Sequence, residues 1–275
     1  MKKIIIFLFI ILALGAAAIY FENDILNFFP DFKKNILDFK KTDVGNIIAE
    51  VSKELLIPPP LQIKGKPSQT VLTKLGIISQ TNLQREQNGN LPALKKNAKL
   101  GQAASAKAND MFLNQYFEHN SLAGVDPGQL VLNHGYKYIV AGENLILGNF
   151  ESEKELVQAW MDSPGHRANI LNNRYSEIGV AIVKGIYKGE TVWIGVQEFG
   201  LPLSSCSEPS STLENEINDK KARLDQMSAQ LDSEKNVNIY NQLVSQYQSL
   251  ASDVKILILQ YNAQVNTFND CVKGL

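Results

Sequence analysis

The central part of the chain is predicted to have an α+β fold, on two observations. Thr81 to Glu86 is predicted to be part of a helix, and from Leu94 to Phe112 small and apolar residues recur every three or four positions, as they do in amphipathic helices. Two β-rich runs follow in "EIGVAIVKGIYKGETVWIGVQEFG", and Tyr187-Lys188-Gly189-Glu190 between them is a hairpin signal. Helices that precede an antiparallel hairpin, rather than alternate with strands, indicate an α+β domain and not a parallel-sheet fold.

The N-terminus "MKKIIIFLFIILALGAAAIYF" is predicted to be a transmembrane or signal helix. Two lysines precede an uncharged run from Ile4 to Phe21, which would span about 27 Å as a helix and just cross a bilayer core. Residues 1–21 are therefore a membrane anchor or, if cleaved near Ala16–Ala18, a signal peptide. Both place the rest of the chain outside the cytoplasm, either anchored to the cytoplasmic membrane or secreted.

Two segments are expected between this helix and the central domain. Residues 22–57 alternate aromatic and charged groups, which predicts an amphipathic helical stalk near the membrane face; a partly ordered stalk is the alternative. Residues 58–72 include "PPPLQIKGKPSQT" and are predicted to be a stiff Pro-rich linker. The central domain then covers residues 73–202.

The domain's second helix is expected to bury a stripe of small and apolar residues. Small side chains on such a stripe allow the helix to pack closely against its neighbour. The stripe consists of Leu94, Ala98, Gly101, Ala104, Ala108, Met111 and Phe112.

Residues 203–275 are predicted to form a helical coiled-coil hairpin. Ten apolar positions from Val237 to Phe268 recur at alternating steps of three and four, and such a seam needs a partner. A second set from Leu213 to Leu231 offers that partner, with a break in phase near Ser233–Asn236. Helices over 213–233 and 237–270 would form a hairpin; the alternative is one long helix that self-associates with a second chain.

Two cysteines, Cys206 and Cys271, flank this helical segment. Export permits a disulfide, and an antiparallel hairpin would bring the two residues within reach. Closing so large a loop would contribute about 4 kcal/mol in the chain-entropy model.

The charge distribution excludes nucleic acid as a partner. The chain has 27 Lys and Arg against 28 Asp and Glu, spread along the sequence. A nucleic-acid-binding protein would show a basic stripe for phosphate contacts.

All three histidines lie in the central domain, in "NQYFEHNS", "VLNHGYKY" and "SPGHRANIL". These stretches resemble, in their order along the chain, the CAP superfamily (SCP domain) of cysteine-rich secretory, antigen 5 and pathogenesis-related proteins. The resemblance also includes "TNLQREQNGNLPALKKNAKLGQAASAKANDMF", "AGENL", "YSEIGVAI" and "WIGVQEFG". The form "SPGHRANIL" resembles the bacterial branch of the family. The resemblance covers about Ile77 to Gly200. It implies an α-β-α sandwich with a central antiparallel sheet.

The resemblance also implies a cleft that holds two histidines and two glutamates. By motif, His119 matches the first histidine, Glu143 the first glutamate and His166 the second histidine. In some members the histidines bind a divalent metal, often zinc. Here the implied metal ligands are His119 and His166, with Glu143 as a third ligand or an orienting group, and no catalytic residue is assigned.

The second glutamate of the family pattern is missing from its usual place. It normally follows the tryptophan by three residues, and Trp160 plus three is Ser163 in this chain. Glu118 and Glu177 are candidates to replace it, although nothing in the sequence places either in the cleft.

The local chemistry of "SPGHRANIL" agrees with a cleft histidine. Ser163 can cap a helix, Pro164 suits the first helical position, and His166 then lies in the first turn. The positive end of the helix dipole disfavours imidazolium there, so His166 should be neutral. The alternative is that it caps backbone groups or bonds a buried carboxylate. For His134, before a glycine, a surface or packing role is expected.

Three functions follow as hypotheses. The first is an exported, non-enzymatic module that binds an extracellular ligand or cell-surface component, with the helical hairpin as a spacer or docking element. The second is a metal-dependent hydrolase acting on peptides or cell-wall material through His119, His166 and Glu143. The third is lipid or sterol binding, as in some eukaryotic relatives. HExxH, GxSxG and phosphate-loop motifs are absent from the sequence.

Overall fold

The computed structural model describes residues 54–65 and 69–274, which fall into two units. One unit comprises Pro209–Val265, and the other comprises the described residues up to Glu208 together with those from Asn266 onward. The predicted helix over 1–21 and the predicted stalk up to residue 53 lie outside the described residues. Within the described ranges, the helices lack the combination of length and hydropathy that a membrane span requires.

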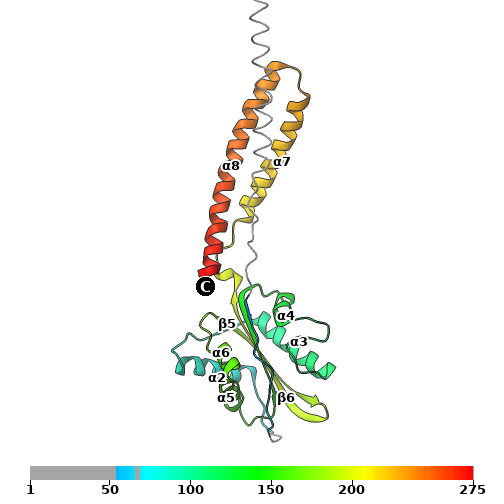
Figure 1. The fold of residues 1–275 in the computed structure, drawn as a ribbon, viewed down its shortest axis with the longest axis vertical. Helices are drawn as coiled ribbons and strands as arrows, with labels where there is room; N and C mark the ends of the chain where they lie inside the picture. The colour runs from blue at the N-terminus through cyan, green and yellow to red at the C-terminus, as the bar shows by residue number, and fades with distance from the viewer. Residues whose placement is uncertain (1–53, 66–68, 275) are drawn as a thin grey trace, which may run out of the picture. The chain divides into compact units, whose positions relative to one another are not determined.

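A mixed sheet forms the centre of the larger unit (Figure 1). Its core is antiparallel: β6 lies between β4 and β5. Short strands pair in parallel with the outer sides, β1 and β2 with β4, and β3 with β5. The sheet is therefore mixed, whereas the family resemblance implied an antiparallel sheet. The strand bounds are β1 Glu54–Leu56, β2 Leu61–Gln62, β3 Lys95–Lys96, β4 Tyr138–Gly148, β5 Glu177–Tyr187 and β6 Glu190–Pro202.

The predicted hairpin between β5 and β6 is confirmed. Lys188 and Gly189 connect the strands, and both have positive φ, 49° and 87°. Two positive φ values in a two-residue loop match the type I′ turn, whose twist suits antiparallel strands.

Helices cover both faces of the sheet (Figure 1). The helices α2, α5 and α6 pack on one face and α3 and α4 on the other. Successive residues of a strand point to opposite faces, so Ile146 of β4 packs with the first group and Leu145 with the second. The helix bounds are α2 Lys74–Gln87, α3 Ala98–Asn114, α4 Pro127–Asn133, α5 Glu153–Asp162 and α6 Pro164–Ile170.

The segment from Glu54 to Gln62 differs from the sequence prediction. Glu54–Leu56 is a strand where an amphipathic helix was predicted, and Leu61–Gln62 is a strand within the predicted linker. The prolines at 58–60 prevent a helix, and the backbone on each side of them pairs instead with the outer side of β4.

The helix α3 begins at Ala98 because the Asn97 side chain accepts hydrogen bonds from the backbone amides of Lys99 and Leu100. Its buried stripe shares Ala104, Ala108 and Met111 with the predicted one. Leu100, Ala103 and Lys107 are also buried, whereas Ala98 is exposed. The buried face is therefore turned slightly from the predicted one, and it includes a lysine.

The smaller unit consists of α7 (Ser211–Ser233) and α8 (Val237–Gly274) up to Val265, and their apolar residues form one cluster. The helices separate at Glu234–Asn236, where the phase of the apolar pattern breaks. Asn236 accepts hydrogen bonds from the amides of Asn238 and Ile239 and so starts α8 without any glycine or proline. The end of α8 belongs to the larger unit, where Cys271 is disulfide-bonded to Cys206 and Phe268 is buried.

The close approach of α3 to β5 depends on Gly179. A Cβ at this position would overlap the backbone of Leu100 and Gly101, whereas a Cβ added at Gly101 would meet no atom within 4 Å. We expect Gly179→Ala to lower the free energy of unfolding by about 1–3 kcal/mol through overpacking. The control Gly101→Ala should leave it unchanged or raise it by about 0.5–1 kcal/mol. Urea denaturation measures both; equal effects would contradict this account of the packing.

Candidate functional site

The register of β4 and β6 brings two glutamates together at the centre of the sheet. Glu143 lies directly opposite Glu198, and Asn144 lies opposite Gln197. Because neighbouring residues point to opposite faces, the glutamates lie on the α3 side and the amides on the α2 and α6 side. Glu143 and Glu198 are 0% and 1% exposed.

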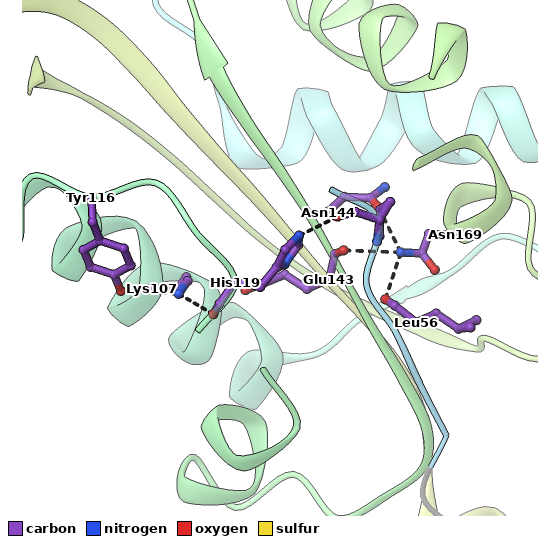
Figure 2. A network of polar contacts seen from close by, with 8 residues as sticks. Leu56, Lys107, Tyr116, His119, Glu143, Asn144 and Asn169 are labelled. Atoms are coloured by element: carbon purple, nitrogen blue, oxygen red, sulfur yellow. Dashed lines mark hydrogen bonds and ion pairs between the residues drawn. The ribbon is translucent and has the colours of Figure 1, made fainter. Parts of the chain in front are cut away.

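His119 is held at both ring nitrogens (Figure 2). Its Nδ1 lies 2.6 Å from Oε1 of Glu143, and its Nε2 lies 2.5 Å from the carbonyl oxygen of Pro58. A carbonyl can only accept a hydrogen bond, so Nε2 carries the hydrogen and donates it to Pro58. The first histidine and first glutamate of the predicted set are therefore in direct contact.

Glu198 is the second buried carboxyl of the site. Burial raises its pKa well above 4.5; the negative charge of Glu143 and a hydrogen bond with that carboxyl raise it further, and Lys107 lowers it. Among the described residues, Oε2 of Glu143 and Oε1 of Glu198 have no hydrogen-bond partner. A proton retained on Glu198 lets this carboxyl donate a hydrogen bond to Glu143.

Lys107 connects α3 to the loop that carries His119. Its Nζ donates to the backbone carbonyl of His119 at 2.5 Å and to the hydroxyl of Tyr116 at 3.3 Å (Figure 2). Burial lowers the pKa of Lys107, while the negative charges of Glu143 and Glu198 raise it. This lysine fixes the position of His119 and provides positive charge near the carboxyl pair.

His166 lies in the first turn of α6, as predicted. Burial, and next the charge of His119, lower its pKa from 6.5 to about 4, so the ring is neutral at neutral pH. Its Nδ1 lies 2.8 Å from the Ser163 hydroxyl. Ser163 is the N-cap residue but makes no side-chain cap bond, because its hydroxyl contacts the imidazole instead. The neutral ring of His166 and its position in the first turn of α6 agree with the sequence prediction. The prediction that the Ser163 side chain caps the helix is wrong.

Asn169, which sequence reasoning missed, joins three segments of the site (Figure 2). Its Nδ2 donates to the carbonyl oxygens of Leu56 and Glu143, at 3.1 and 3.3 Å, and to Oδ1 of Asn144 at 2.9 Å. It lies one helical turn after His166 within the same motif, and this spacing is the only sequence signal of its role.

The second carboxyl of the site comes from Glu198. The two candidates named from the sequence, Glu118 and Glu177, do not supply it. Glu118 is exposed, and Glu177 accepts a hydrogen bond from the Tyr136 hydroxyl at 2.8 Å. The signal that could have found Glu198 is an acid inside the apolar strand "WIGVQEFG", since a buried carboxyl needs a partner.

His134 lies at the end of α4, outside this site. Its Nδ1 is 2.9 Å from the carbonyl oxygen of Leu130 at the C-terminus of the helix. Packing at the end of a helix accounts for this residue.

The donor set does not fit a metal ion as it is arranged here. Both nitrogens of His119 are engaged, and His166 has only Nε2 without a partner among the described residues. In residues 54–65 and 69–274, no group of three or more His, Cys, Asp or Glu side chains is placed to hold a metal. A catalytic zinc site needs three converging ligands. The zinc or other divalent metal stays a prediction.

Residues 78–199 match the model of the cysteine-rich secretory protein family, CAP. The match covers the stretch whose motifs resemble that family. The Bacillus subtilis protein YkwD is 36% identical over 118 residues, 43% of this chain and 45% of YkwD. The B. subtilis membrane protein YlbC is 32% identical over 125 residues, 45% of this chain and 35% of YlbC. The chain thus spans less than half the length of these relatives.

Two solved structures are also similar. An extracellular protein containing a SCP domain from Bacillus anthracis is 28% identical with a TM-score of 0.40, over 46% of this chain and 39% of that one. An outer surface protein from Borrelia burgdorferi is 24% identical with a TM-score of 0.40, over 46% of this chain and 90% of that one.

The neutral state of His166 predicts acid sensitivity. Its stabilising contribution is fully present above pH 6.5 and is lost as the pH falls toward 4, because only the unfolded chain takes up the proton in that window. The difference in free energy of unfolding between wild type and His166→Asn should therefore shrink from pH 7 to pH 4, as measured by urea denaturation. His134→Asn controls for the loss of an imidazole. A difference that stays constant over this range would contradict the prediction.

The proton on Glu198 predicts the opposite trend. Above pH 4.5 the unfolded chain releases this proton while the folded chain keeps it, so stability falls as the pH rises, by up to about 1 kcal/mol per unit. Glu198→Gln keeps a donor to Glu143 and removes the titration, so its stability should fall less than that of the wild type from pH 5 to pH 8. Glu177→Gln is the matched control, and thermal unfolding across this range is the measurement. Parallel curves for wild type and Glu198→Gln would show that Glu198 is ionised in the folded state.

Proposed function

Because residues 78–199 form a CAP domain, we propose that this chain is an extracytoplasmic binding protein. It takes an extracellular ligand or cell-surface component into the cleft beside His119, whose ring the buried Glu143 holds, and it does so without catalysis. The site residues are those of the sequence prediction, His119, Glu143 and His166, with Glu198 added.

The observation that carries this proposal is the state of His119. Its Nδ1 is fixed by Glu143, and its Nε2 donates to a backbone carbonyl. A general base needs a free nitrogen lone pair directed at a substrate proton, and a metal ligand needs the same lone pair. The His119 ring is held by Glu143 and presents its Nε2–H to a carbonyl, so it is instead suited to recognition by hydrogen bonding.

A hydrolase is the second candidate, and the carboxyl pair favours it. Two buried acids that hold one proton between them are a pattern found at acid–base sites. In its metal-dependent form, with His119, His166 and Glu143 as ligands, Pro58 would have to leave Nε2 of His119. Against this candidate, neither carboxyl is accessible in the structure. Lipid or sterol binding stays a prediction.

The location outside the cytoplasm is part of the same proposal. It is supported by the lysine-flanked apolar run at residues 1–21 and by the disulfide between Cys206 and Cys271, which suits an oxidising compartment. The helical unit serves as a spacer or docking element. Since α7 and α8 bury their apolar stripes in one cluster, the unit does not need a second chain to cover that seam.

The test presents one mixture to the immobilised full-length chain and follows two readouts. The mixture combines a tryptic digest of casein with solubilised peptidoglycan fragments, and mass spectrometry records which components are retained and which are newly cleaved. We expect retention that falls about tenfold or more in His119→Ala, through loss of the hydrogen bond that its Nε2 donates. We expect no new cleavage products.

His134→Ala is the matched control and should retain the same components as the wild type. Circular dichroism verifies that His119→Ala is folded. Cleavage products that appear with the wild type and disappear in His119→Ala or Glu198→Gln would establish the hydrolase instead.

A further inference from the structure

The segment Glu54–Ile63, which we term the proline strap, runs along the outer side of β4. It pairs in parallel through Glu54–Leu56 and Leu61–Gln62, and the amide of Ile63 donates to the Leu147 carbonyl at 2.9 Å. Between the two paired parts, Ile57–Pro60 passes the stretch of β4 that contains Glu143. Prolines have no N–H, so they cannot continue the ladder there.

Pro58 enters the candidate site. Its carbonyl accepts from Nε2 of His119, and its ring packs against Gly165 of α6, where an added Cβ would lie 2.7 Å from Cβ of Pro58. Pro58 is buried, whereas its neighbours Ile57 and Pro59 are exposed. One proline ring and its carbonyl therefore occupy the space next to His119 that a ligand would use.

The site recognises the strap mainly through backbone. Asn169 donates to the carbonyl of Leu56, and His119 donates to the carbonyl of Pro58 two residues later. The outer side of β4 supplies the ladder on both sides of these contacts. Strand addition to a sheet edge, with a pocket for one side chain, is a common mode of peptide recognition. An extended segment with a proline at one position would meet every one of these requirements.

The strap is bound through short elements. Its paired parts are three and two residues long, and Glu54, Ile57, Pro59 and Gln62 are exposed. The ion pair of Glu54 with Arg174 lies at the surface, where such pairs contribute little. Leu55, Leu56, Leu61 and Ile63 pack against the core but are only partly buried, and within Glu54–Ile63 only Pro58 is buried. A segment with so few fully buried side chains opens at a smaller free-energy cost than the whole domain. Without the strap, β4 would have an unpaired edge that can accept another strand.

We propose that the cleft is a binding site for extended proline-containing peptides. The proline strap of the same chain occupies this site, and a proline-containing peptide of another protein displaces the strap. This inference rests on the proposed binding function and names its ligand class. Because the cis segment is tethered, it competes at an effective concentration near millimolar, and a peptide in trans binds the wild-type chain weakly.

The first experiment measures binding of a fluorescein-labelled peptide ELLIPPPLQI to the detergent-solubilised full-length chain by fluorescence anisotropy. Pro58→Glu removes the ring that fits Gly165 and puts a charged side chain in this buried position, so the strap in cis is released. We expect the peptide to bind this variant about tenfold or more tightly than the wild type. The same peptide with glutamate in place of its first proline should not bind.

Two double variants test the site itself. In Pro58→Glu with Gly165→Ala, the added Cβ excludes the proline ring, and binding should fall to the wild-type level or below. In Pro58→Glu with Gly101→Ala, the extra methyl lies in open space, and the tight binding should persist. Equal binding in the two double variants would overturn the proposal, as would no gain in Pro58→Glu.

A second measurement needs no variant and covers the case in which Pro58→Glu does not fold. Unlabelled peptide added to the wild-type chain should release the strap, so amide hydrogen exchange at Leu61–Ile63 should rise with peptide concentration up to about 1 mM. The glutamate-substituted peptide should leave it unchanged. Exchange that is insensitive to both peptides would overturn the proposal.

The outcomes separate this inference from the proposed function. Retention of the casein and peptidoglycan mixture through His119, without binding of the proline peptide, would overturn the ligand class and leave the binding function standing. Binding of the proline peptide followed by its cleavage would leave the ligand class standing and overturn the absence of catalysis.

Discussion

Two carboxyl groups face each other at the centre of the sheet, and the rest of the site is arranged around the difficulty of burying them. Both Glu143 and Glu198 are inaccessible, so the pair cannot carry two negative charges without a large cost. Burial and the charge of Glu143 therefore raise the pKa of Glu198 and favour its protonated form. Glu143 contacts His119 directly, and Lys107 lies near both carboxyls. The carboxyl pair therefore requires a cationic or hydrogen-donating neighbour, and α3 and the loop after it supply two.

The pairing of these acids depends on strand register, which the opposite face of the sheet helps to hold. A slip of β4 by one residue would turn Glu143 to the α2 and α6 side while Glu198 stays on the α3 side, and it would separate the two carboxyls. Asn144 bonds Gln197 at 3.1 Å, and Gln197 bonds Thr81 of α2 at 2.8 Å. Polar side chains on both faces of the sheet thus specify one register. The contacts of Asn144 and Gln197 help to keep Glu143 opposite Glu198.

Features with a local cause could be predicted from the sequence. The turn at Lys188-Gly189 follows from residues that tolerate positive φ, and the apolar seams of α7 and α8 follow from their spacing. The contact of His119 with Glu143 lies in the site that the family motifs imply.

Features that depend on distant pairing could not be predicted. The strands β1, β2 and β3 have only two or three residues, too few for an alternating pattern. Glu198 becomes a partner of Glu143 only through the register of β4 and β6, and Pro58 meets His119 across 61 positions of sequence. The three prolines indicated a linker because their composition is typical of one, and composition does not show which carbonyl will be bound.

Nε2 of His119 would be used in peptide binding and in a metal-dependent or acid–base reaction, so these functions exclude one another. While Nε2 donates to Pro58, it has no lone pair for a metal ion or for a substrate proton. If the strap leaves, the partly buried N–H of His119 loses its carbonyl acceptor, and water or another carbonyl can take its place. A second carbonyl restores that bond without any change in protonation, whereas a metal ion requires loss of the proton and a rearrangement of His166. The chemistry around His119 therefore favours exchange of one peptide carbonyl for another over conversion of the cleft to a metal centre.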